Sequence, residues 1–434
     1  MALETEAAVL TGPVLKSAGG EGFHPKFTSV EVRRSQDLTE LIRKIAAADF
    51  DFDALNVFLR IGTFIGTDTP YRHIKADAPD YAWAGNTPVL EGTRAQIIDG
   101  YIDLFRQAIR RCESEEKKFS LGLSGGRDSR HILLELSRAG RTPAHCWTID
   151  LPWNPSEAVV ARELCERLHI QHKVFKLSGK FAVFESYKNR LTSFSSLQHA
   201  WMIEAILGGL VTTAAVFDGI GGDVLSAGLF LNERRLKLLN EARFDELVED
   251  IVGPEENVVA VRETSLFPRR RALERVSEEF RKHLQAPDPI SSFYFWNRTR
   301  RDIGCSAFTL LRSRSQTVHA PYLDPDMCRY LAGIPPSMTV DHNLHSDTIR
   351  KAFPQYAGIV YAGKTNPAGA TAYYRKVAAD SLRYLLRNGS PTVRRTKVCL
   401  QLVRALMFPQ YSQEGLHLGA AAIYLTDLAK WISA

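Results

Sequence analysis

The spacing of apolar residues predicts short buried strands that alternate with amphipathic helices through the middle of the chain. Strands are expected at 119–123, 144–150, 172–177 and 213–218. Helices are expected between them, in a segment that stops at Gly140, at 156–168 with Ser156 as the N-cap, and at 198–210. Strands and helices joined by short connections are typical of a parallel sheet with helices on both faces. We therefore predict an α/β fold.

The flanking regions have mostly helical patterns. Residues 38–48 and 93–112 have the spacing of amphipathic helices, whereas 55–65 fits a helix or a strand ending at Gly66. No clear strand is expected between 230 and 338, where prolines interrupt charged helical segments. Further helices are expected at 372–387, 398–407 and 420–432.

We expect three parts along the chain. A short N-terminal segment covers residues 1–54 and a helical lead-in covers 55–115. The remaining part, 116–434, is expected to be one α/β domain whose C-terminal half is mostly helical.

The turn after the first strand carries the first candidate chemistry. Its sequence is Ser124-Gly125-Gly126-Arg127-Asp128-Ser129. A Gly-Gly turn at a helix N-terminus directs backbone N–H groups outward at the positive end of the helix dipole, where anions bind. The glycines allow a phosphate to approach closely, and the serines add hydroxyl donors. An acid beside a phosphate needs a bridging cation, so we predict that Asp128 helps to hold Mg²⁺.

The alternative is a Gly-Gly turn that only starts a helix. The string Ser-Gly-Gly-x-Asp-Ser is rare by chance, and its strand–turn–helix context favours phosphate binding. It lacks the spaced glycines and the lysine of a Walker-type loop. It resembles instead the pyrophosphate loop of ATP pyrophosphatases, which split ATP into AMP and pyrophosphate. Arg127 and Arg130 either contact phosphate or face solvent.

A second glycine-rich turn follows the strand at 213–218. Its sequence is Asp218-Gly-Ile-Gly-Gly-Asp-Val-Leu-Ser-Ala-Gly228. Alone, such a turn suits a structural role equally well. Ligands of parallel sheets gather at the carboxyl ends of the strands, however, so we expect Asp128 and Asp223 to face one Mg²⁺·pyrophosphate. The nucleotide-binding glycines of this turn would be Gly219, Gly221 and Gly222.

Composition and charge limit the classes of function. The formal net charge is +6, and the basic runs at 269–271, 298–301 and 394–397 are interpreted as solvated helix faces rather than a nucleic-acid surface. The six cysteines are scattered without a Cys-x-x-Cys pair, which disfavours a zinc or thioredoxin-like site and indicates a reduced, cytoplasmic protein. The longest charge-free apolar run, 205–217, is too short to span a bilayer.

These motifs resemble those of the asparagine synthase family, whose synthetase domain adenylates a carboxylate and transfers it to nitrogen. The stretch 218–228 is similar to the family's second glycine-rich turn. The stretch 319–324, His-Ala-Pro-Tyr-Leu-Asp, followed by Ile-Pro-Pro at 334–336, is similar to its Arg-x-Pro-Phe-Leu-Asp and Leu-Pro. Residues 350–354 and 361–365 resemble the segment that supplies the family's catalytic lysine. With the similar linker at 58–75, the resemblance covers roughly residues 55–434.

The resemblance implies an adenine nucleotide alpha hydrolase-like fold that binds ATP and Mg²⁺. Lys364 would stabilise charge on the α-phosphate, with Asp128 and Asp223 as the other catalytic residues and as metal ligands. Thr148 and Ile149 lie where the family seats adenine and ribose. Without the resemblance, Lys364 has the pattern of an exposed loop lysine.

Several positions depart from the family pattern. Residue 2 is Ala2, where family asparagine synthetases carry the nucleophilic cysteine of a glutamine amidotransferase domain, so we expect no glutamine hydrolysis within this chain. Ile220 and Val224 stand in place of carboxylates, and Ile220 also stands where β-lactam synthetases carry a tyrosine. Thr317 falls where both kinds of enzyme carry glutamate. The ATP half of the site is expected to be intact and the acceptor half changed.

The expected function is an AMP- and pyrophosphate-forming amide ligase or cyclase. It would join a small-molecule or peptide carboxylate to ammonia or an amine. Two alternatives stay open: a non-catalytic nucleotide-binding partner of a separate amidotransferase or biosynthetic enzyme, and an RNA-modifying ATP pyrophosphatase. The RNA-modifying reading is disfavoured by missing sulfur-relay cysteines and modest charge. His131, His199 and His319 are expected to pack or hydrogen-bond, and an acid–base role is the alternative for His319.

Overall fold

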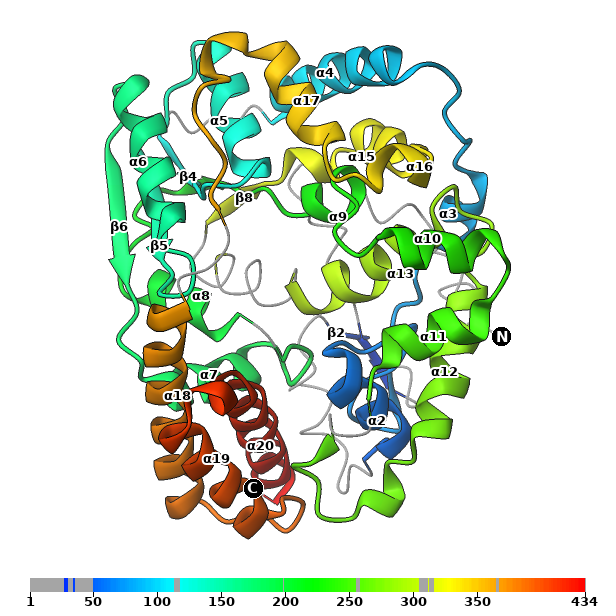
Figure 1. The fold of residues 1–434 in the computed structure, drawn as a ribbon, viewed down its shortest axis with the longest axis vertical. Helices are drawn as coiled ribbons and strands as arrows, with labels where there is room; N and C mark the ends of the chain where they lie inside the picture. Colours follow the sequence, from blue (N-terminus) through cyan, green and yellow to red (C-terminus); the bar gives the residue numbers. More distant parts are fainter. Residues whose placement is uncertain are drawn as a thin grey trace.

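The structure is a computed structural model of the chain. It describes residues 27–29, 34–35, 50–112, 118–197, 199–254, 258–303, 311, 316–363 and 367–433. Figure 1 shows a part that contains the central sheet and, below it, a part made of packed helices. None of the described helices is both long and apolar enough to cross a lipid bilayer.

Five parallel strands form the central sheet, in the order β6-β5-β4-β7-β8. They are β4 (Phe119–Gly122), β5 (His145–Asp150), β6 (His172–Lys176), β7 (Ala215–Phe217) and β8 (Thr317–His319). Leu121 of β4 is in register with Cys146 of β5 on one side and Phe217 of β7 on the other. The carboxyl end of β4 is therefore flanked by those of β5 and β7.

Helices make the crossovers that parallel strands require. α5 (Asp128–Arg138) joins β4 to β5, and α6 (Ser156–Arg167) joins β5 to β6. α7 (Phe181–Leu191) and α8 (Ala200–Leu207) lead from β6 to β7. Gly140, just beyond α5, has the left-handed φ of 70° that ends a helix, as predicted. The predicted α/β class is confirmed.

The long helix α4 (Arg94–Arg111) packs against α5 and α17 (Leu344–Ala352) in the sheet-containing part (Figure 1). It begins with a capping box, in which the Thr93 hydroxyl accepts from the Gln96 N–H and the Gln96 side chain accepts from the Thr93 N–H. Its buried face is apolar. The helix predicted at 93–112 is confirmed.

The C-terminal helices α18 (Pro367–Arg387), α19 (Arg395–Met407) and α20 (Ser412–Ser433) pack together in the lower part of Figure 1. Ala378, Leu402 and Tyr424 come from these three helices and share one buried apolar cluster. Phe58 of α2 (Phe52–Ile61) belongs to the same cluster, so the lower part has a core of its own. The three predicted C-terminal helices are confirmed.

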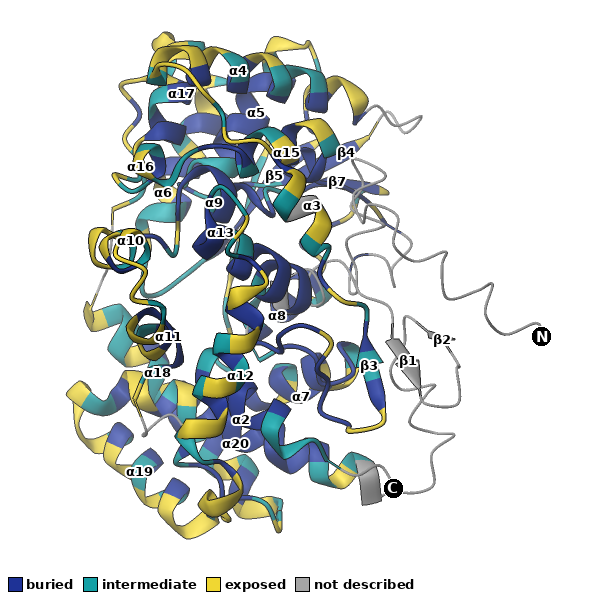
Figure 2. Ribbon diagram, turned by 90° about the vertical axis from the view of Figure 1, so that its right-hand side faces the viewer, coloured by how far each residue is buried: buried dark blue, intermediate teal, exposed yellow. Residues whose placement is uncertain are grey.

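The other described elements connect or cover these two parts. The strands β1 (Phe27–Ser29), β2 (Arg34–Ser35) and β3 (Ile74–Ala76) form a small antiparallel sheet. The helices are α3 (Tyr81–Asn86), α9 (Gly222–Ser226), α10 (Glu233–Asn240), α11 (Phe244–Val252), α12 (Arg269–Arg281), α13 (Pro289–Tyr294), α15 (Pro325–Ala332), α16 (Pro336–Thr339) and the π-helix η4 (Phe295–Ile303). Figure 2 shows α9 and α13 among them as mostly buried.

Local expectations at three element boundaries need correction. β8 lies in the region where no strand was expected. The N-cap of α6 is Pro155 rather than Ser156, because the Ser156 hydroxyl lies within hydrogen-bond distance of Asn154 Oδ1 and Gly363 O instead. Residues 55–65 contain the helix α2, which ends at Gly62 with a φ of 79° before reaching Gly66. The helix expected at 38–48 lies outside the described residues.

The basic run at 298–301 is not a solvated helix face. Arg300 and Arg301 are each only 1% exposed. Arg301 donates to the carbonyl oxygens of Gly66 and Asp68, and Arg300 donates to those of residues 77 and 78. Because both guanidinium groups are buried and bind backbone carbonyls, this run offers little charge to a nucleic acid.

Candidate active site

The first glycine-rich turn occupies the predicted place, between the carboxyl end of β4 and the N-terminus of α5. Its own serines hold its shape. The Ser124 N–H donates to Ser129 Oγ (3.0 Å), and the Gly126 N–H donates to Ser124 Oγ (3.1 Å). The first N–H groups of α5 have no intrahelical acceptor, as in every helix, and are the donors that this turn presents to an anion.

An acid from α6 supports the same turn and was not found from the sequence. The Gly125 N–H donates to Glu157 Oε2, and the Asn154 side chain donates to Glu157 Oε1 (3.0 Å). Burial raises the pKa of Glu157, although the hydrogen bonds from Gly125 and Ser124 oppose that shift. Glu157 therefore anchors the turn and already accepts from one of the N–H groups that were expected to bind phosphate.

The second glycine-rich turn packs directly on Asp128 of the first. A Cβ atom at Gly219 would lie 2.8 Å from the Asp128 Cβ, and one at Gly222 would lie 2.7 Å from Asp128 Oδ1. Gly221 has a φ of 89°, which favours glycine. The two turns expected to meet are thus in contact, and two of the glycines are required by that contact.

Three aspartates gather where the turns meet. Burial raises the pKa of Asp128 to about 7, and Arg127 opposes this shift. Burial also raises the pKa of Asp218 and that of Asp223 to about 6, with a further contribution from neighbouring carboxylates, including Asp128. Carboxylates held together in this way favour a proton or a cation between them.

The donor set fits a magnesium ion that is shared with a phosphate substrate. Within the described parts of the chain, no three Asp, Glu, His or Cys side chains are grouped to hold a metal by themselves. Mg²⁺ usually takes one or two carboxylates and completes its shell with phosphate oxygens and water. Asp128 and Asp223, two acids beside the first glycine-rich turn, match that pattern.

A buried network behind Asp128 was also not found from the sequence. His345 Nδ1 lies 3.2 Å from Asp128 Oδ1 and 3.0 Å from Ser226 Oγ. His345 Nε2 lies 3.2 Å from the Tyr322 hydroxyl and 3.3 Å from His131 Nδ1. Burial lowers the pKa of His345 to about 3, so its imidazole is neutral and acts as a hydrogen-bonding support. His131 has the hydrogen-bonding role expected of it.

Thr148 and Ile149 lie on β5, next to β4. Thr148 Oγ1 donates to the Leu123 carbonyl (2.6 Å) and lies 2.7 Å from His172 Nε2, and Ile149 is buried. Both residues are therefore at the sheet edge that carries the first turn. Their contact with adenine and ribose stays a prediction.

Lys364 lies outside the described residues. The chain immediately before it is described and rests on the first turn and on α6. The Ala362 N–H donates to the Gly125 carbonyl (3.0 Å), and the Gly363 carbonyl is 3.0 Å from Ser156 Oγ. The catalytic role of Lys364 stays a prediction, but the segment that leads to it is held at the site.

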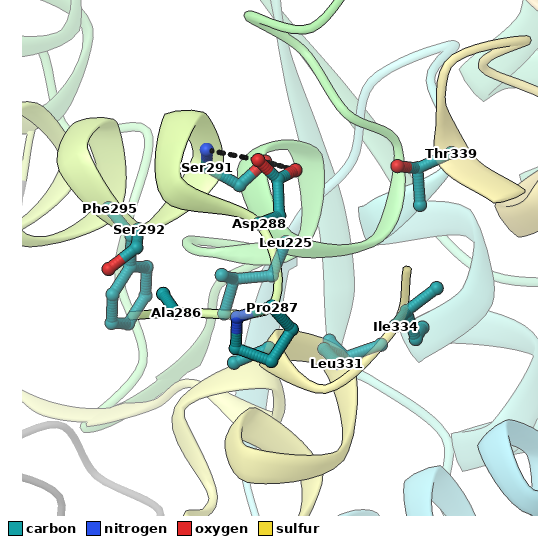
Figure 3. A pocket seen from close by; sticks show the side chains of 11 residues that line it. Leu225, Ala286, Pro287, Asp288, Ser291, Ser292, Phe295, Leu331, Ile334 and Thr339 are labelled. Atoms are coloured by element: carbon teal, nitrogen blue, oxygen red, sulfur yellow. Dashed lines mark hydrogen bonds between the residues drawn. The ribbon is translucent and has the colours of Figure 1, made fainter. Parts of the chain in front are cut away.

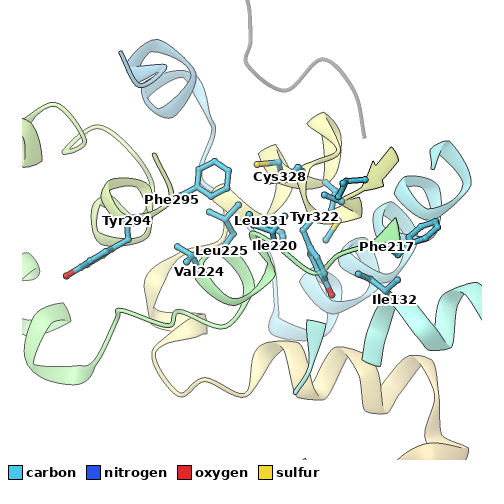
Figure 4. Packing of buried hydrophobic residues seen from close by; sticks show 14 of the residues in the cluster. Ile132, Phe217, Ile220, Val224, Leu225, Tyr294, Phe295, Tyr322, Cys328 and Leu331 are labelled. Carbon is cyan, nitrogen blue, oxygen red and sulfur yellow. The ribbon is translucent and has the colours of Figure 1, made fainter. Parts of the chain in front are cut away.

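Two of the three positions that depart from the family pattern in the acceptor half, Ile220 and Val224, are apolar. Figure 4 shows Ile220 and Val224 in a cluster with Leu225 and Tyr322, where both are buried. Thr317 is exposed at the start of β8. No carboxylate stands at these three positions.

His319 lies at the end of β8, where its carbonyl accepts from the Asp218 N–H (2.9 Å). Burial lowers the pKa of His319 to about 4, and Arg141 adds to this effect. Its ring packs on Phe217, with ring centroids 4.9 Å apart. His199 packs edge-on against Trp201.

Two cavities differ greatly in size. The cavity in Figure 3 lies between Leu225, Pro287 and Leu331, and its volume of about 10 Å³ is too small for a substrate. Asp288, which also lines this cavity, caps α13 and accepts a hydrogen bond from the Ser291 hydroxyl. A second, of about 800 Å³, lies between α2, α7, α18 and α20. Its aromatic lining residues are Trp153, Phe181, Trp201, Tyr373, Tyr374 and Tyr411.

The comparison with protein-family models identifies the family. Residues 100–358, more than half of the chain, match the family model of asparagine synthase. The chain belongs to the asparagine synthase family. Among solved structures it is similar to NMN synthetase from Francisella tularensis, with 14% sequence identity over 48% of this chain and 93% of that chain, at a TM-score of 0.22. No curated protein matched the sequence.

Proposed function

We propose that the protein is an amide ligase that activates a carboxylate with ATP and releases AMP and pyrophosphate. A carboxylate oxygen attacks the α-phosphorus, and the bond from that phosphorus to the bridging oxygen breaks as pyrophosphate leaves. The nitrogen of ammonia or an amine then attacks the acyl carbon, loses a proton, and displaces AMP. The observation that carries this proposal is the contact of Gly219 and Gly222 with Asp128, because it unites both motifs of the family's nucleotide site.

The ATP half of the site supplies donors and acids for these steps. The serine hydroxyls of the first turn and the N–H groups that begin α5 would bind the phosphates. Asp128 and Asp223 would hold Mg²⁺, which neutralises phosphate charge as pyrophosphate leaves. Lys364 would stabilise charge on the α-phosphate and on the later tetrahedral intermediate.

The acceptor half supports a substrate unlike that of family asparagine synthetases. Ile220, Val224 and Thr317 provide no carboxylate to take a proton from an attacking amine. The cavity of about 800 Å³ lies within the size range of ligand pockets and is larger than one amino acid requires. Its wall residue Trp153 lies four residues before Glu157, so their backbones are within about 14 Å of each other. We therefore propose a carboxylate of peptide size.

Product analysis tests the proposed reaction. The protein is incubated with ATP, Mg²⁺ and a small-molecule cell extract, and phosphorus NMR measures AMP with pyrophosphate against ADP with phosphate. We expect AMP and pyrophosphate in equal amounts, reduced about 100- to 1,000-fold by Lys364→Ala. Lys397→Ala, an exposed lysine on α19, is the matched control. ATP binding without AMP formation would contradict a ligase and support a non-catalytic nucleotide-binding partner.

A further inference from the structure

Arg127 of the first turn and Arg130 of α5 lie against one tyrosine. The guanidinium carbon of Arg130 is 4.1 Å from the centroid of the Tyr361 ring, and that of Arg127 is 5.2 Å from it. Neither guanidinium forms an ion pair with a carboxylate among the residues that the structure describes. The two arginines therefore place positive charge beside the first turn that no described acid neutralises by direct contact.

Arg130 uses its donors inside the protein. It is only 2% exposed, and its Nη1 donates to the Ile359 carbonyl (2.7 Å). Its Nη2 donates to the Val360 carbonyl (2.9 Å). Arg130 thus fixes the segment that precedes Lys364, and with it the ring of Tyr361. This occupied and buried side chain is not suited to bind a ligand.

Arg127 is arranged differently. It is half-buried and stands directly before the first residue of α5. Its Nε donates to Ser346 Oγ of α17 (2.5 Å), and the described residues offer no hydrogen-bond acceptor to its two terminal nitrogens. Ser346 and Tyr361 therefore orient the guanidinium, while the pair of nitrogens that forms its fork stays available.

We propose that Arg127 binds the β- and γ-phosphates of ATP and the pyrophosphate formed from them. This inference rests on the proposed function, because it places the phosphates in the first turn. A guanidinium fork suits two phosphate oxygens, and desolvation beside the turn strengthens each charged hydrogen bond. Arg127 neighbours Asp128, so it supplies positive charge on the same phosphates that the magnesium site would share. Arg127 and Arg130 thus have separate roles: Arg127 binds phosphate, and Arg130 holds the segment that precedes Lys364.

Calorimetric titration with Mg²⁺·pyrophosphate tests the assignment without needing the carboxylate substrate. Arg127→Leu should weaken binding about 10- to 100-fold, which is the usual effect of losing hydrogen bonds to a charged group. Arg127→Lys should recover only part of the affinity because an ammonium has no fork. Ser346→Ala keeps the guanidinium but frees its Nε, so we expect a smaller loss. Arg110→Leu removes an exposed arginine of α4 and should leave binding unchanged.

The outcomes separate this inference from the proposed reaction. Arg127-dependent pyrophosphate binding without AMP formation would retain the phosphate site and refute the ligase. AMP formation by the wild type together with unchanged pyrophosphate affinity in Arg127→Leu would overturn the assignment of Arg127. No measurable pyrophosphate binding by the wild type would also overturn it. If Arg127→Leu fails to fold by circular dichroism, Arg127→Lys and Ser346→Ala decide, and wild-type affinity in both would overturn the assignment.

Discussion

Alanine at Gly219 would test whether the two glycine-rich turns form one site. The added Cβ would lie 2.8 Å from the Asp128 Cβ and 3.4 Å from the Ser129 N. Carbon atoms in contact prefer about 3.5–4.0 Å, so the two turns would have to separate by about 0.7–1.2 Å. The backbone of Gly219 is outside the positive-φ region, so the clash is the main effect of the substitution.

The expected consequence is a loss of rate that exceeds the loss of stability. A misplacement of about 1 Å in a reacting group can cost about a hundredfold in rate, whereas overpacking costs about 1–3 kcal/mol of stability. Initial rates of AMP formation at saturating ATP measure the first effect, and urea unfolding measures the second. Gly389→Ala, at a glycine with open space around it, is the matched control. A Gly219→Ala variant with the wild-type rate, while Asp128→Ala is inactive, would refute the reasoning.

Three further changes probe the supports of the site. Glu157→Ala leaves the buried Gly125 N–H without its acceptor, so urea unfolding should show that the free energy of unfolding falls by about 1–3 kcal/mol. The control Glu166→Ala removes an exposed acid of the same helix and should show no such loss. Burial and neighbouring carboxylates raise the pKa of Asp218 from 3.8 to about 6, so the folded protein holds this proton more tightly than the unfolded chain does. The stabilisation that results is fully present below pH 3.8 and is lost as the pH rises through about 6. Asp218→Asn should therefore flatten the fall in melting temperature over this window, and equal slopes in both proteins would contradict this. Arg130→Leu releases two backbone carbonyls, so limited proteolysis should cut 359–362 faster than in the wild type, and an unchanged rate would show that the arginine does not hold the segment.

The placement of the two glycine-rich turns could be predicted because its determinants are local in sequence. The strand, the turn and the helix that carry Asp128 are contiguous, and each has its own pattern. The meeting of the two turns follows from parallel topology, since β4 and β7 are neighbours and their carboxyl ends share an edge. The glycine contacts with Asp128 and the presence of a third acid, Asp218, needed the structure.

The supports of the site could not be predicted because they join residues far apart in sequence. Glu157 meets a glycine 32 residues away, and His345 reaches Asp128 from α17. β8 has only three residues and pairs with one neighbour, which is too little for an alternating pattern to be recognised. The charge of Arg301 predicted a position in solvent, but the side chain is buried and donates to backbone carbonyls.

Adenylation of a carboxylate is the central claim, and the fate of one oxygen atom tests it most directly. The carboxylic acids of the cell extract are first exchanged in acidic ¹⁸O-water, so that the substrate is labelled before its identity is known. The protein then acts on this extract with ATP in ordinary water, and mass spectrometry follows the label. We predict one ¹⁸O atom in the AMP, because the oxygen that joins the α-phosphorus stays there when nitrogen displaces AMP. Label in inorganic phosphate instead, or AMP without label, would contradict the proposed reaction.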